Sequence, residues 1–210
     1  MTDRLPTEPL RIFIAGASGV VGIRVVPLLV EAGHVVAGMT RTATKAARLR
    51  DLGAEPVVCD VFDPDALRDA LVSFAPNVVL HELTDLPDVL DEVPRRGGAN
   101  ARIRRVGTHN LLTAMAAAGP ARVLAQSIAW QLPGDGGAAV DEMEAMVLGA
   151  GGVVLRYGQF YGPGTYHPAE PPPPPRIHVS TAAHETVRAL DARTGVLDLV
   201  EAVTTAAPPG

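Results

Sequence analysis

The 210-residue sequence predicts an α/β fold built on a doubly wound parallel sheet. Two observations predict this class. Short apolar runs alternate with segments of helical spacing along most of the chain, and parallel strands need crossover helices of this kind. The first apolar run is followed directly by Gly16, Gly19 and Gly22, and this glycine spacing is typical of the turn that joins the first strand to the first helix.

The elements are expected in a regular order. Strands are predicted at short apolar runs, over residues 10–15, 34–39, 56–59, 77–80, 152–157 and 195–200, with another beginning over 122–125. Helices are predicted from the glycine turn to residue 32 and over residues 44–51, 64–73, 101–118, 138–148 and 179–191. An uninterrupted proline run, Pro171 to Pro175, favours an exposed polyproline II segment.

Composition and charge limit the partners of this protein. The formal net charge of −5 argues against a general nucleic-acid-binding surface, although arginines between residues 95 and 105 form a local basic cluster. The single cysteine, Cys59, excludes an intramolecular disulfide. The sequence has neither a signal-peptide core near residue 1 nor an apolar run of about 18 residues. We therefore expect a soluble, cytoplasmic protein with no nucleic-acid or membrane partner.

The glycine turn predicts a dinucleotide site. Gly16 allows a tight turn, Gly19 lets the backbone approach a pyrophosphate, and Gly22 lets the helix pack closely on the strand. The helix that follows presents free N–H groups and the positive end of its dipole to the phosphates. The turn follows a predicted strand and opens a predicted helix, which is the context that such a site requires.

The end of the second predicted strand bears on the choice of cofactor. A fold that prefers NAD usually has an acid about 20 residues beyond the glycines, where it binds the ribose 2′-hydroxyl. Here Arg41 follows the strand, and with Lys45 it suits a 2′-phosphate instead. We expect NADP(H), with NAD as the alternative cofactor and a solvated surface charge as the alternative role of Arg41. Asp60, after the third strand, is a candidate for the adenine amino group or for a helix cap.

Several motifs together resemble one known family. They are Gly16 to Gly22 (GASGVVG), Asp60-Val61, His81 to Pro87 (HELTDLP), Gly107 to Leu112 (GTHNLL), Ala125 to Ser127 (AQS) and Leu155 to Gly164 (LRYGQFYGPG). This set is similar to that of the NAD(P)-dependent epimerase/dehydratase family, among the extended and atypical short-chain dehydrogenases/reductases. The resemblance implies a Rossmann-like fold. It also implies cofactor contacts at Gly16, Ser18, Gly19, Val20, Gly22, Arg41, Asp60, Val61, Tyr161, Gly162 and Pro163.

The resemblance implies a catalytic role for Ser127, at the end of the fifth predicted strand. In the family this serine hydrogen-bonds the substrate, and its partners are a tyrosine and a lysine in Tyr-x-x-x-Lys on the next helix. The next helix of this chain has no tyrosine, and the only lysine is Lys45. Arg104 stands where family members often have an asparagine that organises a relay water. The usual proton relay is therefore absent.

Other side chains are candidates for the missing chemistry. His81 ends the fourth predicted strand and titrates in a useful pH range. Tyr161 is expected beside the nicotinamide by resemblance. For both, a structural or cofactor-contacting role stays open. Glu142 and Glu144 lie on the predicted helix over residues 138–148 and are expected on its solvated face.

The sequence predicts three regions: an NAD(P)-binding Rossmann domain over residues 1–164, a proline-rich linker over 165–176, and a reduced C-terminal substrate region over 177–210, packed on the same domain. We expect an NAD(P)-dependent oxidoreductase, or an epimerase/dehydratase-type enzyme, acting on a small organic substrate that Arg104 and Thr84 contact. A non-catalytic NADP(H)-binding sensor is the alternative, because the relay is missing. No metal is expected, since the histidines lack paired ligand spacing. Family precedent implies a homodimer.

Overall fold

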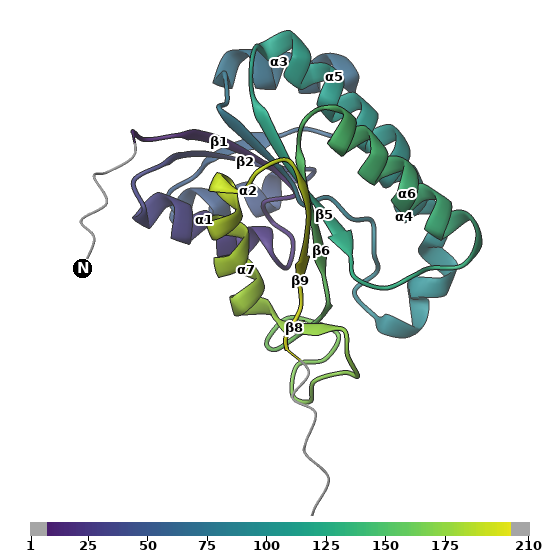
Figure 1. Cartoon of the computed structure of the whole chain (residues 1–210). Coiled ribbons are helices and arrows are strands. Elements are labelled where there is room, and N and C mark those ends of the chain that lie inside the picture. The colour runs from purple at the N-terminus through teal and green to yellow at the C-terminus, as the bar shows by residue number, and fades with distance from the viewer. Residues whose placement is uncertain (1–7, 203–210) are drawn as a thin grey trace, which may run out of the picture.

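A seven-stranded parallel sheet forms the centre of the computed structural model, which describes residues 8–202 (Figure 1). Its order is β3-β2-β1-β4-β5-β6-β9. The chain builds outward from β1 to β3 and then crosses back to β4, so the sheet is doubly wound and the predicted fold class is confirmed. The strands are β1 (Arg11–Ala15), β2 (Val35–Thr40), β3 (Glu55–Val58), β4 (Val78–His81), β5 (Arg122–Ile128), β6 (Val153–Tyr157) and β9 (Gly195–Leu199).

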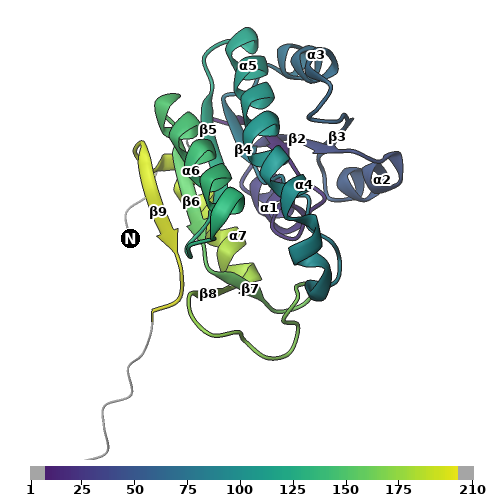
Figure 2. The same cartoon turned by 90° about the vertical axis from the view of Figure 1, so that its right-hand side faces the viewer.

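Helices cover both faces of this sheet (Figures 1 and 2). One layer consists of α1 (Gly22–Glu31), α2 (Ala43–Asp51) and α7 (Val179–Arg188). The other layer consists of α3 (Pro64–Phe74), α4 (Gly97–Arg102), α5 (Thr108–Ala118) and α6 (Gly134–Gly149). Within residues 8–202, no helix has both the length and the apolar character that crossing a membrane requires.

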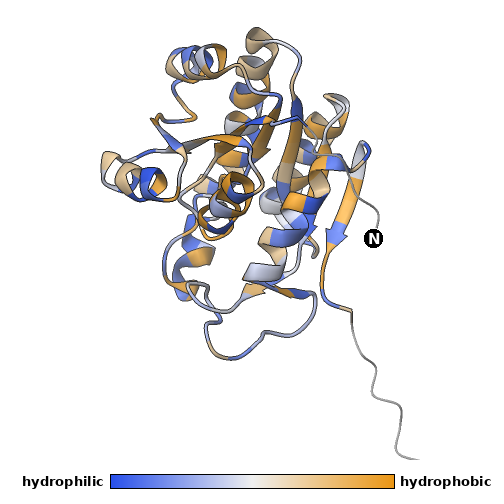
Figure 3. Cartoon of the chain, turned by 90° about the vertical axis from the view of Figure 1, so that its left-hand side faces the viewer, coloured by the Kyte–Doolittle hydropathy of each residue, from blue (hydrophilic) through white to orange (hydrophobic). Residues whose placement is uncertain are grey.

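The strands carry apolar residues on both sides because both sides are covered. In β1, Ile12 and Ile14 pack in the core beneath α1, whereas Phe13 and Ala15 pack in the core beneath α3 and α5. Strands that are buried on both faces read as continuous apolar runs rather than as alternating ones. The orange strands of Figure 3 show this pattern, with hydrophilic residues gathered on the helices and loops.

The predicted helix over residues 101–118 begins earlier and is not regular throughout. It starts with α4 at Gly97, continues through a π-helical turn at Ile103–Gly107, and becomes α5 at Thr108. A wider turn of this kind shifts the direction of the side chains and often occurs at functional sites. The apolar spacing of the sequence predicted the helix but not its wider turn.

Three short elements were not predicted: a 3₁₀ helix at Leu90–Arg96 and the strands β7 (Gln159–Tyr161) and β8 (Arg176–His178). β7 and β8 pair in parallel next to the end of β6. The proline run leads into β8, and the carbonyl of Pro175 accepts a hydrogen bond from the Gln159 N–H at 2.9 Å. Strands of three residues are too short to show a period in the sequence.

Candidate cofactor and substrate site

The glycine turn after β1 is packed so closely that Gly16 and Gly22 have no room for side chains. Gly16 has a φ of +95°, and a Cβ atom there would lie 2.6 Å from the carbonyl oxygen of Glu82. A Cβ atom on Gly22 would lie 2.5 Å from the Gly16 carbonyl oxygen. The turn is closed by the Gly19 N–H, which donates to that same carbonyl at 2.9 Å. A side chain at Gly16 or Gly22 would therefore clash with neighbouring backbone atoms.

The backbone of this turn offers donors to an anion. The N–H groups of Ser18, Val20 and Val21 have no acceptor within residues 8–202, and they precede the first turn of α1. No acidic side chain occupies the first turn of α1. Free N–H groups and a positive helix end are the features that hold a pyrophosphate. The residues present therefore fit a dinucleotide.

The predicted adenosine side lies at the ends of β2 and β3. The hydroxyl groups of Ser18 and Thr40 are 3.1 Å apart, which ties the glycine turn to β2. Arg41 follows β2 directly, and its Nη2 lies 3.4 Å from Oδ1 of Asp85, in the loop after β4. Asp60 accepts a hydrogen bond from the Phe62 N–H at 2.9 Å and so closes its own turn. The Arg41 contact with Asp85 was not foreseen.

Val61 and Thr84 are the other residues predicted on this side. Val61 is buried and packs beside Gly107, where a Cβ atom would come within 3.3 Å of it. Thr84 is half-buried in the loop that follows β4. This loop is held to α4 by Asn100, whose Oδ1 accepts from the Asp85 N–H at 3.1 Å.

The segment Tyr161 to Pro163 is tied to the protein from two directions. The Tyr161 hydroxyl donates to a carboxylate oxygen of Glu201, and this bond raises the pKa of the phenol above its usual value. Gly162 has a φ of +103°, and a Cβ atom there would lie 2.5 Å from Nε2 of His178. Arg24 of α1 donates to the Pro163 carbonyl. The segment is therefore held beside the glycine-turn helix.

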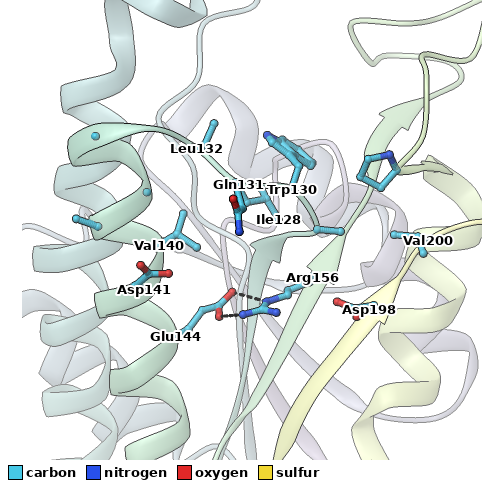
Figure 4. A pocket seen from close by; sticks show the side chains of 15 residues that line it. Ile128, Trp130, Gln131, Leu132, Val140, Asp141, Glu144, Arg156, Asp198 and Val200 are labelled. Carbon is cyan, nitrogen blue, oxygen red and sulfur yellow. Dashed lines mark hydrogen bonds and ion pairs between the residues drawn. The ribbon is translucent and has the colours of Figure 1, made fainter.

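Ser127 has a partner that the sequence analysis did not assign to it. Its hydroxyl donates to Oε1 of Glu144 at 2.5 Å. Arg156 donates to the same carboxylate, from Nε to Oε1 at 2.9 Å and from Nη2 to Oε2 at 2.5 Å (Figure 4). Ser127 and Arg156 are neighbours across β5 and β6, so both face α6. We call Ser127, Glu144 and Arg156 the Glu144 cluster.

The expectation that Glu144 is solvated is wrong. Its side chain is only 7% exposed, whereas Glu142 does face solvent and pairs with Arg105 at 2.8 Å. Burial raises the pKa of Glu144, but the hydrogen bonds from Arg156 and Ser127 outweigh burial and lower the pKa overall. Because this carboxylate is ionised and accepts the hydroxyl hydrogen, Ser127 has no free hydrogen to donate to a substrate.

Arg104 lies on the π-helical turn behind this cluster. Its side chain is buried and makes no hydrogen bond in the part of the chain that the structure describes. Burial lowers the pKa of the guanidinium, and the charge of Glu144 acts in the opposite direction. A largely buried guanidinium whose donors have no partner among the described residues is suited to bind a carboxylate or phosphate of a ligand.

His81 is buried at the end of β4. Its Nε2 lies 2.8 Å from the Thr108 hydroxyl, and its Nδ1 accepts from the Leu83 N–H at 3.4 Å. Burial lowers the pKa of the imidazole to about 4. The ring is therefore neutral at neutral pH, and both of its nitrogens are engaged within the protein.

Glu82 directly follows His81 at the end of β4 and is a buried carboxyl. Burial raises its pKa to about 8. A hydrogen bond from the Tyr157 hydroxyl, at 3.4 Å, acts in the opposite direction. Its Oε2 has no hydrogen-bond partner among the described residues. The Tyr157 hydroxyl also lies 2.7 Å from the Thr186 hydroxyl of α7. Glu82 thus lies on the opposite side of the sheet from the Glu144 cluster.

A groove of about 750 Å³ opens beside the Glu144 cluster (Figure 4). It runs between α6 and β9, with Arg156 on its floor and Trp130 and Leu132 at its rim. Asp141, Asp198 and Glu144 contribute carboxylates to its lining. Among residues 8–202, no group of three His, Cys, Asp or Glu side chains is arranged to hold a metal ion.

The doubly wound sheet, the glycine turn and the free N–H groups before α1 define a dinucleotide-binding protein of Rossmann type. Within that class, the chain belongs to the NAD(P)H-binding family, whose model matches residues 16–148. The prediction of an NAD(P)-binding family with a Rossmann-like fold is thereby confirmed.

The chain is also similar to particular proteins. It is 36% identical over 180 residues to a 3-diazoavenalumate denitrifying reductase of a Streptomyces species, with 74% of this chain and 58% of that protein covered. In structure it resembles the Bordetella bronchiseptica enzyme WbmH in complex with NAD+, at a TM-score of 0.73 and 19% identity, covering 91% of this chain and 75% of that one. The UDP-glucose 4-epimerase of Thermus thermophilus, complexed with NAD, gives a TM-score of 0.73 at 18% identity, covering 91% and 78% of the two chains.

Proposed function

We propose that this chain is a reductase that uses NADP(H) to deliver a hydride to a small organic substrate. The observation that carries the proposal is the contrast between two parts of the site. The N–H groups of Ser18, Val20 and Val21, before α1, have no acceptor within residues 8–202 and can bind a dinucleotide phosphate. The proton-donating groups expected beside the nicotinamide are, in contrast, all engaged within the protein.

Three candidate donors support this contrast. Ser127 donates its hydrogen to Glu144, and Tyr161 donates its hydrogen to Glu201. His81 is neutral at neutral pH and bonded to Thr108. A reduction that needs an acid from the protein, such as that of a ketone to an alcohol, is poorly served by this arrangement. A substrate that accepts a hydride without a proton needs none of these donors and is compatible with the arrangement.

The reductase relative offers such a substrate class, because its name describes the denitrification of a diazo compound. When bound, NADPH supplies a hydride. In the reduction of an arenediazonium group to a C–H bond, this hydride replaces N₂, the C–N bond breaks, and no proton is taken from the protein. We propose this class of electrophile as the substrate, with its ring in the groove beside Trp130.

Two further residues have roles in this proposal. Arg104 would bind a carboxylate of the substrate, since its largely buried guanidinium has donors that no residue between 8 and 202 uses. Arg41 would bind the 2′-phosphate of NADP(H) at the end of β2. Thr84 precedes Asp85 in the loop after β4 and would contact substrate or cofactor.

The test uses NADPH deuterated at C4, in both stereoisomers, and an arenediazonium compound that bears a carboxylate. We expect protein-dependent NADPH oxidation and one deuterium atom on the arene carbon that carried nitrogen, measured by mass spectrometry. Reactions without protein, and with a Gly22→Ala variant, control for the spontaneous reaction. An arene without deuterium, whose new hydrogen comes from the solvent, would refute direct hydride transfer.

A non-catalytic NADP(H)-binding sensor is the second candidate, and the engaged side chains of Ser127, Tyr161 and His81 also favour it. The two functions are separated by one comparison. A sensor binds NADPH tightly and shows no substrate-dependent oxidation with diazonium, carbonyl or sugar-nucleotide compounds. Turnover with any of them excludes the sensor.

A further inference from the structure

Arg41 has a counter-charge within the protein. Its Nη2 lies 3.4 Å from Oδ1 of Asp85, and the two side chains are 49% and 24% exposed. The two residues are 44 positions apart in the chain, because Arg41 follows β2 and Asp85 lies in the loop after β4. Within residues 8–202, Arg41 makes no other ion pair.

The framework fixes the position of Asp85. Its N–H donates to Oδ1 of Asn100 at 3.1 Å, and Asn100 is buried on α4. At the start of the same loop, the Glu82 N–H donates to the Ala15 carbonyl of β1 at 2.8 Å. The loop is therefore anchored at Glu82 and at the N–H of Asp85 itself, which holds the backbone that carries this carboxylate beside the end of β2.

The location of this carboxylate matches a known requirement of dinucleotide recognition. Folds that bind NAD use an acid at the end of β2 to accept hydrogen bonds from the ribose hydroxyls. This chain has Arg41 in place of that acid, and Arg41 contacts the carboxylate of Asp85. A carboxylate there also repels a 2′-phosphate and competes with it for Arg41.

We propose that Asp85 is a specificity-determining residue that lets this chain bind NADH as well as NADPH. This inference rests on the proposed nicotinamide cofactor. With NADH, Asp85 accepts a hydrogen bond from the ribose 2′-hydroxyl. With NADPH, Arg41 leaves Asp85 and pairs with the 2′-phosphate, while Asp85 opposes the added charge. The ratio of the two affinities is therefore set by the Arg41–Asp85 pair and not by Arg41 alone.

The test measures dissociation constants of NADH and NADPH for the wild type and the Asp85→Asn variant, by nucleotide fluorescence at fixed ionic strength. Asparagine keeps the size of the side chain and the backbone bond to Asn100 but removes the charge. We expect the variant to bind NADPH more tightly, because the repulsion of the 2′-phosphate is removed, and NADH more weakly, because the hydrogen bond to the 2′-hydroxyl loses its charge. Together these changes should raise the preference for NADPH about tenfold.

Asp88→Asn is the matched control, because Asp88 is an exposed acid in the same loop with no bond to Arg41. It should leave the preference unchanged. If Asp85→Asn alters the preference no more than Asp88→Asn does, while both nucleotides still bind, the inference is overturned and the proposed cofactor stands. If the folded wild type binds neither nucleotide, the proposed function fails and the inference fails with it.

Discussion

Replacing Glu82 by glutamine is predicted to remove a pH-dependent loss of stability. Glu82 is 4% exposed, and its Oε2 has no partner in the described chain. Burial raises its pKa to about 8 from the ordinary 4.5. Between these two values the unfolded chain has lost the proton while the folded chain keeps it, so the stability of the fold decreases as pH rises.

The magnitude follows from the separation of the two pKa values. Each pH unit between them costs about 1.4 kcal/mol, so the wild type loses about 3 kcal/mol by pH 7 and between about 4 and 5 kcal/mol above pH 8. Below pH 4.5 the loss is absent. Tyr157, the ionisable group that faces Glu82, does not add to this, because its pKa is raised well above 10. Glutamine is close in size and does not titrate.

The assay is urea unfolding, followed by the fluorescence of Trp130, at pH values from about 5.5 to 8.5. We expect the stability difference between Glu82→Gln and wild type to grow from about 1 kcal/mol at pH 5.5 to between about 4 and 5 kcal/mol at pH 8.5, in favour of the variant. Glu31→Gln, at an exposed site at the end of α1, is the control and should show no such trend. Parallel pH profiles for wild type and Glu82→Gln would show that Glu82 is ionised in the folded protein and would refute this reasoning.

The remaining predictions concern the glycine turn, the Glu144 cluster and the cofactor charge. Gly22→Ala should lower the melting temperature and abolish nucleotide binding, because its Cβ would meet the Gly16 carbonyl at 2.5 Å; a binding titration and a thermal melt test this. Glu144→Ala should destabilise the fold by about 3 kcal/mol in urea unfolding, since it leaves a buried hydroxyl and a guanidinium without their acceptor, and an unchanged midpoint would contradict the burial argument. Arg41→Ala should weaken NADPH about tenfold and NADH less, and equal loss for both would remove the 2′-phosphate role.

Local patterns in the sequence were sufficient to predict most of the strands and helices of the fold. The strands are buried on both faces, so each appears as an apolar run, and the helices between them show their own spacing. The glycine turn was also predictable, because its requirements are steric and lie within Gly16 to Gly22. The strands β7 and β8 were missed because three residues cannot show a period, and the π-helical turn was missed because it leaves the apolar spacing nearly intact.

Only the tertiary structure decided which charged groups meet. Glu144 was expected in solvent, but the pairing of β5 with β6 places Ser127 and Arg156 beneath it, and their hydrogen bonds outweigh the cost of burying its charge. The contact of Arg41 with Asp85 joins two loops from different strands, which meet because the carboxyl ends of parallel strands share one edge of the sheet. The sequence by itself determined a dinucleotide-binding fold. The electrostatic character of its site depends on distances between residues far apart in the chain, which no local pattern encodes.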